Sequence, residues 1–88
     1  MEILKNSNGT SYTVLAKMQS GSKNRNNVFL LQSPKGEYIV ALGWSKKYSC
    51  WSFGHYFMND RKAAMKDFMA EAEKIAWYAS APVLKLDK

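Results

Sequence analysis

The sequence has few of the residues that build disulfide frameworks, metal centres or membrane spans. Its 88 residues include one cysteine, Cys50, and one histidine, His55. A single cysteine excludes a disulfide within the chain. No apolar run approaches the roughly 18 residues that a membrane helix needs, and the polar run at residues 6–11 leaves no apolar segment of a signal peptide near the start. We therefore expect a cytoplasmic protein that does not associate with membranes.

The length and the apolar content predict one small folded domain over residues 1–88. Hydrophobic residues make up 47% of the chain and aromatic residues 14%, which is enough for a thin core and too much for a disordered chain. A chain of this size buries about 60–65% of the surface that it exposes when unfolded. We therefore expect modest stability, or stability that is supported by dimerisation.

Positive charge is concentrated in the first part of the chain. The sequence carries 13 Lys and Arg against 7 Asp and Glu, a net charge of +6. Residues 1–58 hold seven of the basic and two of the acidic side chains, whereas residues 59–88 hold six and five. The positive electrostatic field of residues 1–58 attracts phosphate groups or an acidic protein surface. The alternative is a protein that is basic without such a partner.

Turn residues divide the first two thirds of the chain into short β-strands. The pattern predicts strands at residues 2–5, 10–18, 27–32, 37–44 and 49–57. Asn8-Gly9 and Ser33-Pro34-Lys35-Gly36 have the composition of tight turns, and residues 19–26 (QSGSKNRN) predict an exposed basic loop. The later connections are too short for parallel crossovers, so we expect an antiparallel meander.

A helix is predicted to follow the strands. Asn59 or Asp60 can cap its start, and Pro82 ends it near Ser80. An apolar stripe recurs at helical spacing, and its members are Ala64, Met65, Phe68, Ala72, Ile75 and Ala79. The tail at residues 83–88 either adds an edge strand or folds back. The predicted fold class is α+β, an antiparallel sheet of four to five strands followed by one helix packed on one face.

The sequence contains no pattern typical of a catalytic or metal site. Cys50 and His55 lie five residues apart on a predicted strand, so their side chains point to opposite faces and cannot share a metal or a proton. Asp67, Glu71 and Glu73 lie among lysines on the helix, as in a solvated, salt-bridging face. We therefore expect no catalytic residue, no metal and no cofactor, and a protein that acts by binding.

Aromatic side chains are crowded into residues 44–57, with lysines between them. The last two predicted strands have a face of large residues and a face of small ones. The large face holds Tyr38, Val40, Leu42, Trp44, Trp51, Phe53 and His55, and the small face holds Ala41, Gly43, Ser52 and Gly54. If the helix covers the small face, the large face is exposed and suits base stacking and phosphate binding. If the helix covers the large face, the same aromatics are core.

The first orientation predicts a module that binds single-stranded nucleic acid with little sequence preference. The candidate residues are Lys23, Arg25, Lys46 and Lys47 for phosphate, and Trp44, Tyr48 and Trp51 for stacking. Trp77 falls opposite the helix stripe. It is a candidate contact for a protein partner or a homodimer, unless the tail folds over it.

Part of the sequence resembles a group of small uncharacterised proteins from phages and integrative elements of Gram-positive bacteria. The resemblance rests on Gly36-Glu37-Tyr38-Ile39-Val40-Ala41, on Trp51, on Gly54-His55-Tyr56-Phe57, and on Ala63-Ala64 with Asp67-Phe68. It implies a hairpin that leads into a helix, a bacterial cytosolic setting and an accessory or anti-defence role, and it transfers no catalytic residue. The order of strands before a helix also resembles the single-strand-binding fold of the coactivator and Whirly type, in architecture alone.

This resemblance supports a second hypothesis, an inhibitor encoded by a mobile element. Such an anti-CRISPR or antirestriction protein would bind a host nuclease, or another nucleic-acid-processing protein, through the same surface or through Trp77. Many inhibitors of this kind imitate DNA by being acidic, so a basic chain would act by another route. A structural homodimer is the third hypothesis.

Overall fold

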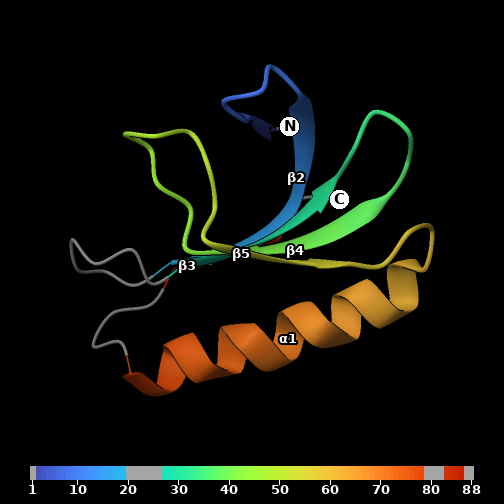
Figure 1. Ribbon diagram of the computed structural model, residues 1–88. Coiled ribbons are helices and arrows are strands. Elements are labelled where there is room, and N and C mark those ends of the chain that lie inside the picture. Colours follow the sequence, from blue (N-terminus) through green and yellow to red (C-terminus); the bar gives the residue numbers. More distant parts are fainter. Residues whose placement is uncertain (1, 20–26, 79–82, 87–88) are drawn as a thin grey trace.

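The computed structural model describes the chain over residues 2–19, 27–78 and 83–86, and describes side chains as far as Ile75. Its elements, in chain order, are β1 (Glu2–Lys5), β2 (Ser11–Gln19), β3 (Asn27–Gln32), β4 (Tyr38–Leu42), β5 (Phe53–Tyr56), α1 (Arg61–Tyr78) and β6 (Val83–Leu86). The predicted α+β fold, an antiparallel sheet with a helix after its fifth strand, is confirmed (Figure 1). The tail adds an edge strand, one of the two arrangements expected of it.

The strands β1 to β5 form an antiparallel meander in which each strand pairs with the next. β2 also pairs with β6. The first half of β2 pairs with β1, where Val14 lies opposite Glu2, and the second half pairs with β6, where Ala16 lies opposite Leu86. The two short strands therefore lie end to end along one edge of β2.

The two predicted tight turns form as their sequences indicate. Gly9 and Gly36 both have positive φ, at 90° and 85°, a backbone conformation that glycine adopts without steric cost. The Gly36 N–H donates to the Ser33 carbonyl at 2.9 Å, which closes the turn between β3 and β4. These turns fix which strands become neighbours.

A β-bulge at Leu15 exchanges the two faces of β2. Val14 lies opposite Leu31 and Ala16 opposite Leu30, so Leu15 is the additional residue between two consecutive partners. Val14 consequently packs with residues on one face of the sheet, and Ala16 packs with residues on the other. A strict alternation would have placed both on the same face.

The helix covers the face that carries the large aliphatic residues of β3 and β4. This cluster consists of Ala16, Met18, Val28, Leu30, Val40, Ala64, Phe68 and Ala72, with Tyr38 and Leu42 packed against it. The orientation with the helix on the small-residue face is therefore wrong. Leucine and valine side chains beneath Phe68 bury more apolar area than glycine and serine would, and burial is the main driving force.

A second apolar cluster lies on the opposite face of the sheet. It consists of Tyr12, Val14, Phe29, Leu31, Ile39 and Ala41, with Leu4, Trp44 and Trp51 packed against it. In Figure 1 the helix runs below the sheet, while the turn after β1 and the loop between β4 and β5 rise above it. Both faces of the central strands are therefore covered, although only one carries a helix.

The start of the helix follows the capping prediction. Asp60 Oδ1 accepts a hydrogen bond from the Ala63 N–H at 3.0 Å, and the Asp60 carbonyl accepts one from the Ala64 N–H at 3.1 Å. Asp60 is thus the N-cap. Among the described residues, no helix has the length and apolar character needed to cross a membrane.

The two clusters predict that neighbouring residues of β3 contribute similarly to stability. Leu30 lies under the helix and Leu31 lies in the second cluster, and both are fully buried. Leu30→Ala and Leu31→Ala should each lower the free energy of unfolding by about 2–5 kcal/mol, because each leaves a cavity. Urea unfolding followed by circular dichroism measures this. Met69→Ala, at an exposed helix position, is the control, and a near-neutral Leu31→Ala would contradict the two-sided core.

Candidate nucleic-acid interface

The candidate residues that the structure describes lie in one segment between β4 and β5. Lys46, Lys47 and Tyr48 are exposed on this loop, and Trp44 and Trp51 are half-buried near its two ends. We call residues 43–52 the aromatic loop. Three further candidates fall elsewhere: Lys23 and Arg25 lie outside the described residues, and Trp77 lies in α1 with its side chain outside them. The structure therefore brings together five of the eight predicted positions.

The aromatic loop is held at its base by Asn27. The Trp44 N–H donates to Asn27 Oδ1 at 2.7 Å, and Asn27 Nδ2 donates to the Trp44 carbonyl at 3.1 Å. Gly43 precedes this contact with φ at 72°. The loop then closes on itself, because the Ser45 N–H donates to the Cys50 carbonyl at 2.8 Å. The loop is thus an ordered extension of the β4–β5 hairpin.

The two tryptophans of this loop pack on the face opposite the helix. The Trp51 ring meets the Tyr12 ring edge to face, with centroids 5.3 Å apart at 76°, and the Trp44 and Trp51 centroids are 6.1 Å apart. The prediction that they share a face with Val40 and Leu42 is wrong. Strand alternation holds only within a continuous strand, and the left-handed Gly43 and the loop interrupt it.

Two of the exposed rings near the tryptophans belong to tyrosines, while a third, Phe53, is 71% exposed and lies opposite Leu42 of the helix side. Tyr48 is 58% exposed and Tyr56 is 65% exposed. A Cβ added at Gly54 would lie 2.8 Å from Tyr56 Oη and 2.9 Å from Trp51 Nε1, so the Tyr56 ring reaches back across Gly54 toward Trp51. Sequence reasoning missed Tyr56, although a glycine within an aromatic strand is a recognised sign of close approach.

The surface around these rings carries positive charge. The sequence has no Asp or Glu between Glu37 and Asp60, whereas Lys46 and Lys47 lie within that stretch. The Lys47 ammonium lies 5.3 Å from the centroid of the Tyr48 ring, a cation–π distance. The neighbouring turn at residues 6–10 is uncharged and contacts the loop through a 2.7 Å hydrogen bond from the Ser7 N–H to the Ser49 carbonyl. We call Lys46, Lys47, Tyr48, Trp51 and Tyr56 the aromatic–lysine surface.

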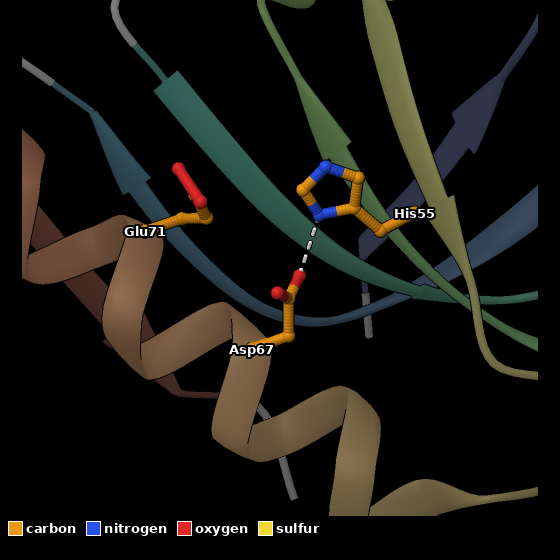
Figure 2. Close-up of side chains that lie close together, drawn as sticks. All are labelled: His55, Asp67 and Glu71. Atoms are coloured by element: carbon orange, nitrogen blue, oxygen red, sulfur yellow. Dashed lines mark hydrogen bonds and ion pairs between the residues drawn. The ribbon is translucent and has the colours of Figure 1, made fainter.

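A separate group of polar side chains joins β5 to α1 on the helix side. His55 Nδ1 lies 2.8 Å from Asp67 Oδ2, and Figure 2 shows Glu71 one helical turn further on along α1, on the same side of the helix. One ligand atom from each of the three residues lies within 4.8 Å of the others. We call these residues the His55 cluster. Sequence reasoning missed it, because only the fold brings β5 next to that side of the helix.

Comparison of the chain with models of protein families, with curated protein sequences and with solved structures finds no match. The resemblance to proteins of phages and integrative elements therefore stays a prediction.

The contact between Asn27 and Trp44 predicts that this asparagine determines the position of the loop. Asn27→Ala leaves the Trp44 N–H and carbonyl without their partner and should lower the free energy of unfolding by about 1–3 kcal/mol. Amide hydrogen exchange at Trp44 measures whether the loop is still held in place, and urea unfolding measures the change in the free energy of unfolding. Asn59→Ala, at an exposed position, is the control. Unchanged exchange at Trp44 would show that Asn27 does not hold the loop.

Proposed function

We propose that this protein binds single-stranded nucleic acid through the aromatic–lysine surface and acts by binding, without enzymatic activity. The observation that carries the proposal is the contact of Lys47 with the exposed Tyr48 ring, in a stretch, residues 38–59, that also holds Lys46 and the exposed Tyr56 and holds no carboxylate. Aromatic platforms beside basic side chains are the usual means of binding single strands. The net charge of +6 acts in the same direction at longer range.

The phosphate contacts are assigned to Lys46 and Lys47. Both are exposed and adjacent on the outer part of the aromatic loop. A lysine ammonium is a mobile point charge that neutralises phosphate without fixed geometry, which suits a backbone whose sequence is not being read. Lys23 and Arg25, which lie outside the described residues, add to the net positive charge of the chain.

The stacking contacts are assigned to Tyr48 and Tyr56. Their rings are more than half exposed, whereas Trp44 and Trp51 give much of their surface to the second apolar cluster. The tryptophans pack against the core, and the tyrosines offer their exposed ring surface, which at Tyr48 is the face away from Lys47. Every base has a π face, so stacking of this kind discriminates little between sequences.

The salt dependence of binding tests the role of the lysines. Lys46→Gln/Lys47→Gln removes two phosphate contacts and should lower the slope of log affinity against log salt by about 1.4, since each contact on a single strand contributes about 0.7. Fluorescence anisotropy with a labelled oligothymidylate measures the slope. Lys62→Gln/Lys66→Gln, two exposed helix positions, is the control with the same change in charge.

Two outcomes would refute this assignment. One is a salt slope that falls in Lys62→Gln/Lys66→Gln and does not fall in Lys46→Gln/Lys47→Gln. The other is the absence of any micromolar complex at low salt. Capture of a nuclease from a bacterial lysate that has been treated to destroy nucleic acid would instead favour the inhibitor hypothesis.

Loss of a stacking ring should weaken binding without changing the salt slope. Tyr48→Ala and Tyr56→Ala should each reduce affinity about 5- to 150-fold, because a stacked base contributes about 1–3 kcal/mol. The same anisotropy titration reports this, with Tyr48→Phe and Tyr56→Phe as controls that keep the ring. Equal binding by the alanine and phenylalanine variants would exclude stacking at these positions.

A further inference from the structure

We propose that His55, Asp67 and Glu71 form a binding site for a divalent transition-metal cation, of which Zn²⁺ is the representative. The site lies between β5 and α1 (Figure 2). It lies on the helix side of the sheet, whereas Trp51 and Tyr12 of the second apolar cluster lie on the other side. The proposal stands independently of nucleic-acid binding.

The three ligand atoms are already close to the arrangement that such an ion needs. A tetrahedral zinc with bonds of about 2.0–2.1 Å places its ligand atoms about 3.3 Å apart. His55 Nδ1 and Asp67 Oδ2 are 2.8 Å apart, and one ligand atom from each of the three residues lies within 4.8 Å of the others. Small side-chain rotations, chiefly of the long Glu71 side chain, therefore complete the geometry.

The backbone that carries these ligands is fixed by the core. Asp67 and Glu71 are four residues apart on α1 and so lie on the same side of the helix. Phe68 and Ala72, each next to one of them, are buried against the sheet. Val40 lies opposite His55 in the pairing of β4 with β5 and is also buried. An ion would therefore meet ligands whose separation is set by packing.

The donor set selects among cations. One imidazole nitrogen and two carboxylates suit Zn²⁺, Co²⁺ or Ni²⁺, whereas Ca²⁺ and Mg²⁺ prefer oxygen ligands throughout. Two carboxylates also balance the charge of a divalent ion. His55 and Asp67 retain 44% and 27% of their side-chain exposure, so an ion can enter from solvent and keep a coordination position for water.

Two existing contacts compete with the ion. The metal takes the lone pair of His55 Nδ1, so the hydrogen bond from this nitrogen to Asp67 is lost. The imidazole then binds as the tautomer with its hydrogen on Nε2, and any additional proton is released to water. Lys74 lies 3.1 Å from Glu71 Oε2 and is 67% exposed, so its ammonium can move away into water. The Glu71 side chain is 16% exposed, but an ion pair whose lysine is solvated in this way is weak. Lys74 therefore lowers the affinity of the site without closing it.

Titration with zinc chloride tests the site. The tag-free chain carries Cys50→Ser, which removes the exposed thiol as a competing ligand, and isothermal titration calorimetry measures stoichiometry and affinity. We expect one Zn²⁺ per chain at micromolar affinity, undiminished by millimolar Mg²⁺. Glu71→Gln and His55→Ala should each weaken binding at least tenfold, and Lys74→Met should tighten it several-fold.

Glu73→Gln is the matched control, because it changes an exposed carboxylate on the same helix that is outside the cluster. Circular dichroism of each variant establishes that it is folded. The site is overturned if no saturable binding occurs below millimolar Zn²⁺, or if Glu73→Gln weakens binding as much as Glu71→Gln. It is also overturned if Glu71→Gln binds as tightly as the parent chain, because His55 and Asp67 would then be only a hydrogen-bonded pair.

Discussion

Burial of β3 on both of its faces is the constraint on which the rest of this structure depends. Its four consecutive apolar residues, 28–31, are all buried. The helix can cover only one side of a sheet, so Phe29 and Leu31 need a second cover. The tryptophans of the aromatic loop, together with Leu4 of β1, provide it. A chain of 88 residues thereby obtains two thin apolar layers where a single layer would bury little surface.

This second layer determines what the aromatic loop can offer to a ligand. Because Trp44 and Trp51 pack against Tyr12 and its neighbours, they are part of the protein's own interior as much as of its surface. Tyr48 and Tyr56 are more exposed than these tryptophans, whereas the exposed ring of Phe53 lies opposite Leu42, a residue of the helix side. The tryptophans and the tyrosines therefore differ for a physical reason, because a ring that covers the core cannot present both of its faces to a base.

The strand β5 connects the two proposed sites. Consecutive side chains on a strand point to opposite faces, so His55 faces the helix while Tyr56 lies across Gly54 beside Trp51. A metal ion held by His55 would tie β5 to α1 along this edge of the sheet. The same strand carries the exposed Tyr56 ring, the proposed stacking contact, on its other face.

Local chemistry in the sequence determined the elements of this protein. The strand at residues 27–32, the turns at Gly9 and Gly36, the cap at Asp60 and the buried helix positions Ala64 and Phe68 all follow from the properties of neighbouring residues. Only the tertiary structure decided which face each element presents. A bulge at Leu15 and the left-handed Gly43 each break the two-residue period by which sequence assigns faces. The His55 cluster likewise could not be predicted from neighbouring residues, because His55 and Asp67 are twelve residues apart and meet only when the helix packs on the sheet.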